Sequence, residues 1–150
     1  MKLMILDGNS IINRAFYGIR MLNAPDGTPT NAVYGFLSTF RRVFDLTQPQ
    51  AVCVAFDVHA PTFRHEQYAL YKAQRKPMPE ELVVQMPLLK QTLDHMGILR
   101  LELAGWEADD LLGTVARRCE AAGWACEIVT GDKDSLQLIT DTTHVCHVKT

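Results

Sequence analysis

Residues 98–132, ILRLELAGWEADDLLGTVARRCEAAGWACEIVTGD, read as strand, helix and strand, with acidic residues after each strand. Apolar residues dominate 98–105 and 125–132, whereas 107–123 carries them at helical spacing and ends at Gly123, a residue typical of helix C-caps. Strands connected in this way pair in parallel through a right-handed crossover. We therefore expect two parallel strands joined by one helix.

The same alternation runs through the whole chain. Helical segments are expected at 10–19, with Asn9 or Ser10 as N-cap, and at 32–47, 80–97 and 133–139. Further apolar runs at 2–7, 51–57 and 143–149 predict three more strands. Together these segments predict one three-layer α/β domain over residues 1–150, with a mostly parallel central sheet and helices on both faces.

The composition is that of a globular domain. The chain has 150 residues, of which 47% are hydrophobic and 21% charged, and a net charge of −2. No apolar run approaches the roughly 20 residues of a membrane span, and the N-terminal run is too short for a signal peptide. We expect a cytoplasmic monomer that makes no membrane contact. Without CxxC spacing, four cysteines are expected to be reduced core thiols: Cys53, Cys119, Cys126 and Cys146.

Acidic residues follow four of the predicted strands. In open parallel sheets ligands bind outside the carboxyl ends of the strands, so these side chains should meet at one edge. Each acid alone is explained by a turn or by the first turn of a helix. Together they would repel one another, which predicts a bound cation. The seven candidate ligands are Asp7, Asp57, Glu107, Asp109, Asp110, Asp132 and Asp134.

The candidate ligands are all oxygen donors. No His or Cys is spaced to join them, and hard oxygen ligands favour Mg²⁺ or Mn²⁺ over zinc. Glu107 and Asp110, three residues apart, should share a helix face, and Glu107 should precede the first full turn. Two such ions about 4 Å apart can activate water and stabilise the leaving oxygen of a phosphodiester.

A basic, aromatic segment lies at about 58–80. Between Pro61 and Pro79 it holds four basic residues and one acidic residue, without a clean apolar period. We expect an exposed insertion whose cations face phosphates. Its tyrosines, Tyr68 and Tyr71, could stack on bases or pack within the insertion.

Several motifs, in order and spacing, resemble those of one family. They are ILDGNS, TNAVYGF, VAFD, TFRHEQYALYKAQR, PEEL, GWEADD and TGDKDSLQL. This set resembles the N-terminal 5′ nuclease domains of bacterial DNA polymerase I, which belong with the flap endonucleases on a fold related to PIN domains. The resemblance covers nearly the whole chain.

The resemblance implies a metal-dependent, structure-specific 5′ nuclease that acts on DNA with single-stranded 5′ ends or flaps. It makes the seven acids metal ligands, for two ions in the complete enzyme, and makes segment 58–80 a helical arch. Lys72 and Arg75 take the catalytic positions that face the scissile phosphate. The DNA-binding positions it implies are Arg14, Arg64, Tyr68, Tyr71, Lys72 and Arg75.

The same resemblance implies a longer protein. The family continues with a helix-hairpin-helix-like module that binds duplex and supplies two further carboxylates, and then with polymerase domains. We therefore expect this chain to be the N-terminal part of such a protein. Two alternatives stay open: a fragment that binds metal and single-stranded DNA without efficient turnover, and a PIN-type ribonuclease. The basic insertion argues against the ribonuclease.

Overall fold

The computed structural model describes residues 1–58 and 78–148. Strands and helices alternate along this part of the chain, as the sequence predicts. In chain order the elements are β1 (Lys2–Asp7), α1 (Gly8–Gly18), α2 (Asn31–Thr47), β2 (Ala51–Ala55), α4 (Glu80–Val83), α5 (Gln85–His95), β3 (Leu99–Leu101), α6 (Ala108–Ala121), β4 (Ala125–Thr130), the 3-10 helix η1 (Lys133–Leu138) and β5 (Thr143–His147).

The five strands form one sheet in the order β3-β2-β1-β4-β5. Each of the four neighbouring pairs is parallel, which confirms the predicted fold class. β3 is shorter than predicted, because only its first residues, Leu99–Leu101, pair with β2 at the edge of the sheet. The arch predicted at about 58–80 falls mainly on residues outside those that the structure describes.

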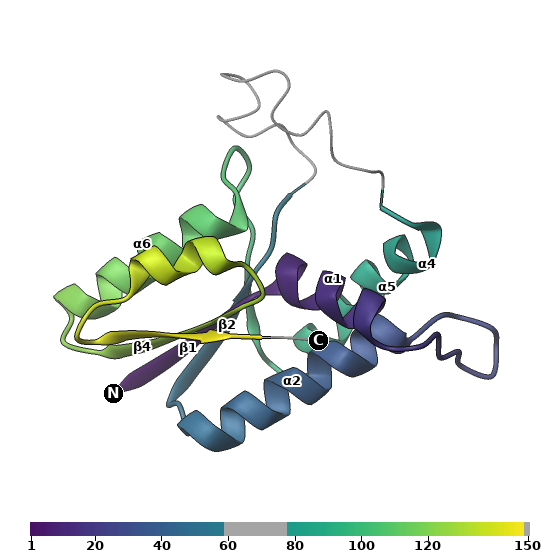
Figure 1. The fold of residues 1–150 in the computed structure, drawn as a ribbon, viewed down its shortest axis with the longest axis horizontal. Helices are drawn as coiled ribbons and strands as arrows, with labels where there is room; N and C mark the ends of the chain where they lie inside the picture. Colours follow the sequence, from purple (N-terminus) through teal and green to yellow (C-terminus); the bar gives the residue numbers. More distant parts are fainter. Residues whose placement is uncertain (59–77, 149–150) are drawn as a thin grey trace.

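Helices cover both faces of the sheet (Figure 1). Alternate strand residues supply the two cores, as the period of two in a strand requires. On one face Leu6 and Val54 pack with α1, α2 and α5. On the other face Ile5 and Ile128 pack with α6, whose Leu112 is fully buried. The domain therefore has three layers, with the sheet between two sets of helices.

Two local predictions were wrong. α1 begins at Gly8 and its N-cap is Asp7, whose carboxylate accepts a hydrogen bond from Ser10 N, so neither Asn9 nor Ser10 is the cap. The helix predicted over 80–97 is divided at Val84 into α4 and α5. α5 ends at His95, two residues before Gly97, which adopts a positive φ of 74°. In the described part of the chain, no helix is both long and apolar enough to cross a membrane.

A neutral polar cluster, here called the amide network, joins four helices: α1, α2, α4 and α5. Gln85 is fully buried, and its Oε1 accepts hydrogen bonds from Ala32 N at 2.8 Å and Val33 N at 3.1 Å. Its Nε2 donates to Asn31 Oδ1 at 2.9 Å and to Glu81 O at 2.9 Å. Asn31 in turn donates to two carbonyls at the end of α1. Gln85 thus caps α2, whose Thr30 makes no side-chain cap.

Candidate metal centre at the carboxyl edge of the sheet

The acids gather where the winding of the sheet changes direction. β1 is central, β2 and β3 extend to one side of it, and β4 and β5 extend to the other. The crevice between the ends of β1 and β4 is therefore the topological switch point, where open α/β sheets bind ligands. We call the seven acids at this side of the sheet the carboxylate edge: Asp7, Asp57, Glu107, Asp109, Asp110, Asp132 and Asp134.

Asp7 ends β1 and is only 3% exposed. Its Oδ1 accepts from Ser10 N at 3.3 Å and its Oδ2 from the Thr130 hydroxyl at 3.0 Å. Burial raises the pKa of Asp7 above its usual value, and the hydrogen bonds from Ser10 and Thr130 offset part of that rise. The negative charge of Asp57 raises this pKa further.

Asp57 follows β2 and is tied to two other elements. Its backbone N donates to Asn9 Oδ1 on α1 at 2.8 Å. Its side-chain Oδ1 accepts from Ala108 N, the first residue of α6, at 2.6 Å. A carboxylate at a helix N-terminus is favoured by the orphan backbone N–H groups there. Asp57 therefore holds the start of α6 against the end of β2.

Glu107, Asp109 and Asp110 form the start of α6. Glu107 is its extended N-cap, buried at 4% exposure, and forms a capping box with Asp110, whose Oδ2 accepts from Glu107 N at 3.0 Å. The predicted position of Glu107 before the first full turn is confirmed. The pKa of Asp109 is raised to about 6, first by burial and then by the charges of Asp7, Asp132, Asp57 and Glu107. Asp109 is thus the electrostatic centre of the carboxylate edge.

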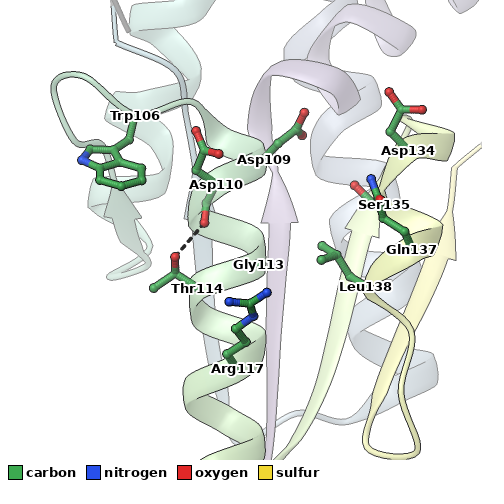
Figure 2. A pocket seen from close by; sticks show the side chains of 10 residues that line it. All are labelled: Trp106, Asp109, Asp110, Gly113, Thr114, Arg117, Asp134, Ser135, Gln137 and Leu138. Atoms are coloured by element: carbon green, nitrogen blue, oxygen red, sulfur yellow. Dashed lines mark hydrogen bonds between the residues drawn. The ribbon is translucent and has the colours of Figure 1, made fainter. Parts of the chain in front are cut away.

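Asp132 and Asp134 come from the turn after β4. Asp132 is the N-cap of η1, and its Oδ1 accepts from Asp134 N at 2.9 Å. Asp132 N donates to the Thr130 hydroxyl at 3.0 Å. Asp134 lies across an open pocket of about 490 Å³ from Asp109 and Asp110. Figure 2 shows these acids at one end of the pocket and Arg117, about two turns further along α6, at the other.

The structure brings the seven acids to one edge of the sheet, but their side chains do not converge on one metal-binding position. Within residues 1–58 and 78–148, no three His, Cys, Asp or Glu side chains lie close enough together to hold a metal ion. Carboxylate oxygens of Asp57, Asp110 and Asp132 instead accept hydrogen bonds from backbone N–H groups. Asp109, Asp110 and Asp134 line the pocket.

The chemistry of these side chains fits a hard divalent cation. All are oxygen donors, and the raised pKa of Asp109 shows that its ionised form is disfavoured among its neighbours. A cation would reverse that effect, since an opposite charge within a few Å favours the carboxylate.

Of the basic residues predicted to bind DNA, Arg14 lies in the described part of the chain, beside the carboxylate edge. The side chain of Arg14 packs over Gly131, where a Cβ would lie 2.5 Å from Arg14 Nε. Gly131 therefore leaves the space that Arg14 occupies. The other predicted catalytic and DNA-binding residues lie outside the described residues: Arg64, Tyr68, Tyr71, Lys72 and Arg75.

The acids are supported by three residues that sequence reasoning did not assign to the site. Asn9 holds the backbone of Asp57, and Ser10 and Thr130 contact Asp7. The available signal was their position: each lies within three residues of Asp7 or Asp132, in DGNS and TGD.

Fold and site together define a class: a doubly wound α/β domain with a carboxylate-lined switch point. The model of the family described as "5′-3′ exonuclease, N-terminal resolvase-like domain" matches residues 2–150, so the chain belongs to that family.

Curated relatives carry the name of one enzyme. The thermostable DNA polymerase I of Thermus aquaticus is 40% identical over 146 residues, which are 97% of this chain and 17% of that protein. The DNA polymerase I of Bacillus subtilis is 42% identical over 144 residues, 96% of this chain and 16% of that protein. The chain thus spans about a sixth of the length of these relatives.

Solved structures share the fold. A bacteriophage T5 5′-exonuclease with bound zinc matches with a TM-score of 0.73 and 22% identity, over 98% of this chain and 55% of that one. A T5 flap endonuclease complexed with DNA and metal ions matches with a TM-score of 0.74 and 21% identity, over 98% of this chain and 55% of that one. These structures confirm the predicted architecture.

Proposed function

We propose that this domain is a divalent-metal-dependent 5′ nuclease that hydrolyses DNA phosphodiesters at single-stranded 5′ ends or flaps. The carboxylate edge carries the proposal, because Asp109 stands among four other acids at the switch point and its pKa is raised to about 6. Membership of the exonuclease family supports the reaction class. The relatives named DNA polymerase I support DNA as the substrate.

The seven acids of the edge would hold the metal, Mg²⁺ or Mn²⁺, with two ions in the active enzyme. A divalent ion there supplies Lewis-acid stabilisation of the phosphate and lowers the pKa of bound water. The chain's own residues orient these groups: Asp57 fixes the start of α6, and the capping box fixes Glu107 against Asp110. Arg14 is proposed to bind a phosphate beside Gly131, with Lys72 and Arg75 facing the scissile phosphate.

The test is cleavage of a 5′-labelled flap DNA with Mg²⁺ and with a chelator. We expect cleavage only with Mg²⁺, and a loss of about 100-fold or more in Asp109→Asn, since ligand loss removes electrostatic stabilisation of the transition state. Asp141→Asn is the matched control, because Asp141 is exposed in the turn after η1. Equal cleavage in chelator would contradict the metal mechanism. Preference for a matched RNA would favour a PIN-type ribonuclease.

A second candidate is a domain that binds metal and single-stranded DNA with poor turnover. It is favoured by the absence, among the described residues, of three acids close enough to hold one ion. Calorimetric titration with Mn²⁺ separates the two readings. Mn²⁺ binding that is lost in Asp110→Ala, without flap cleavage by the unsubstituted chain, would support binding alone.

A further inference from the structure

The ends of β1 and β4 are held together by side chains. The backbone register between these strands extends from Lys2↔Ala125 to Leu6↔Val129. Asp7 and Thr130, the next residue on each strand, lie beyond this register. Between them the link is the hydrogen bond from the Thr130 hydroxyl to Asp7 Oδ2, at 3.0 Å. Both residues are almost fully buried, at 3% and 0% exposure.

The Thr130 hydroxyl bonds both to Asp7 on β1 and to Asp132 after β4. A hydroxyl has one proton to donate and two lone pairs to accept with. The proton goes to Asp7 Oδ2, and one lone pair accepts from Asp132 N at 3.0 Å. Thr130 itself is held by the residue that follows β5, because its carbonyl accepts from Val148 N at 2.8 Å. One hydroxyl therefore fixes the position of Asp7 relative to the turn after β4 that contains Asp132, here called the Asp132 turn.

Ser10 supports the same arrangement from α1. Its Oγ accepts from Gly131 N at 2.9 Å and lies 3.2 Å from Thr130 Oγ1. Since the Thr130 proton is committed to Asp7, the Ser10 hydroxyl is the donor in that contact, shared with Asp7 O at 3.4 Å. The hydrogen bonds thus run in one direction, from Gly131 N–H through Ser10 and Thr130 to the Asp7 carboxylate. Such chains polarise one another, which strengthens each bond.

We propose that Thr130, supported by Ser10, is a positioning residue that sets Asp7 relative to the Asp132 turn and thereby tunes divalent-ion affinity. The inference rests on the proposed function, in which Asp7 and Asp132 are ligands. Groups that orient metal ligands typically change metal affinity or activity by about 10–100-fold when they are removed. A purely structural threonine would instead change stability alone.

The test compares Thr130→Val, which keeps the shape but removes the hydroxyl, with Thr130→Ser, which keeps the hydroxyl. Calorimetric titration of the 150-residue chain with Mn²⁺ should show an affinity about 10-fold or more weaker for Thr130→Val. Thr130→Ser should stay within about threefold, because it retains both bonds. Thr143→Val is the matched control: Thr143 is also buried on a strand, but lies at the opposite end of the sheet.

A second readout does not involve the metal. Hydrogen exchange of the metal-free chain should show the Asp132 amide exchanging about tenfold faster in Thr130→Val, because its acceptor is gone, and at the original rate in Thr130→Ser. If Thr130→Val is not stably folded, as judged by the absence of a cooperative unfolding transition, Ser10→Ala replaces it. In Ser10→Ala we expect faster exchange at the Gly131 amide and weaker Mn²⁺ binding.

Each experimental outcome either supports or overturns the inference. Unchanged Mn²⁺ affinity in Thr130→Val, or in Ser10→Ala where that variant is used, overturns the inference. Equal losses in Thr130→Ser and Thr130→Val overturn it too, because the hydroxyl would not be the cause. If the unsubstituted chain binds no Mn²⁺, the proposed metal function fails and the inference fails with it. If that chain binds and the Val variant binds equally well, only the inference fails.

Discussion

The domain contains two polar regions that are built in opposite ways. In the amide network, Gln85 uses both lone pairs of Oε1 and both N–H groups of Nε2 on protein partners. At the carboxylate edge, burial and four neighbouring acids raise the pKa of Asp109 to about 6. The first region is neutral and complete without any ligand. The second concentrates charge of one sign.

This difference separates a region that stabilises the fold from one arranged for a ligand. Neutral buried groups with all their hydrogen bonds rigidify a core at little cost. Like charges in a low-dielectric setting destabilise it until an opposite charge arrives. Substitutions in the two regions should therefore act with opposite signs on the stability of the metal-free chain.

The largest effect is expected in the amide network. Gln85→Leu leaves the Ala32 and Val33 N–H groups and part of the Asn31 amide buried without partners. Each such group costs about 1–3 kcal/mol, so the free energy of unfolding should fall by about 3–5 kcal/mol in urea titrations. Gln91→Leu, on the exposed side of α5, is the control and should change it by less than about 0.5 kcal/mol. Similar losses in both variants would contradict the role of the network.

Divalent ions should stabilise through the carboxylate edge. An ion that binds only the folded state adds about 2.7 kcal/mol at 100 times its Kd, so Mn²⁺ should raise the Tm of the metal-free chain. Gln85→Leu should keep this increase and Asp109→Asn should lose most of it, as scanning calorimetry can measure. A melting curve that Mn²⁺ leaves unmoved would show that the edge is not a metal site.

Removing one charge from the edge should stabilise the metal-free chain at neutral pH. The pKa of Asp109 is about 6 in the fold, above its ordinary 3.8, so its contribution to stability is lost as the pH rises from about 4 to 6. Asp109 is partly exposed, and after allowance for solvent screening Asp109→Asn should gain about 1–2 kcal/mol at pH 7.

The gain in Asp109→Asn should disappear near pH 4, where both side chains are neutral. Urea titrations at the two pH values measure the difference. A gain that is the same at both pH values would point to packing rather than charge.

The smallest effect on stability is expected at Gly131. A Cβ there would meet the flexible end of Arg14, which can move, so Gly131→Ala should cost about 1 kcal/mol or less. Displacing Arg14 should nonetheless weaken flap-DNA binding several-fold and reduce its salt dependence by about one phosphate contact. Fluorescence anisotropy at several salt concentrations measures both. Gly113→Ala is the control, since its Cβ would find an ordinary contact at 3.6 Å.

Sequence reasoning predicted the parallel sheet and the strand ends that carry the acids. It did so because buried parallel strands are continuous apolar runs, and because Asp7 ends one of them and Asp132 lies two residues after another. It missed the division of the helix at Val84 and the true cap of α1. Helix boundaries depend on which side chain reaches an orphan N–H, which spacing alone does not specify.

The long-range hydrogen bonds could not be predicted from the sequence alone either. Gln85 caps a helix that begins 54 residues earlier, at Asn31, and Thr130 donates to Asp7 across 123 positions. Their partners lie far away in the sequence, so these roles appear only when separate elements are packed together.

By itself, the sequence determined the layers of the domain and the edge at which its acids lie, because apolar periodicity and strand polarity are local properties of the chain. Only the tertiary structure decided which acid is the electrostatic centre and what holds each one in place. The pKa of Asp109 depends on burial and on charges from four segments. The position of Asp7 depends on the Ser10 backbone N–H of α1 and on the Thr130 hydroxyl of β4. Such effects fall off with distance in space, whatever the separation along the chain.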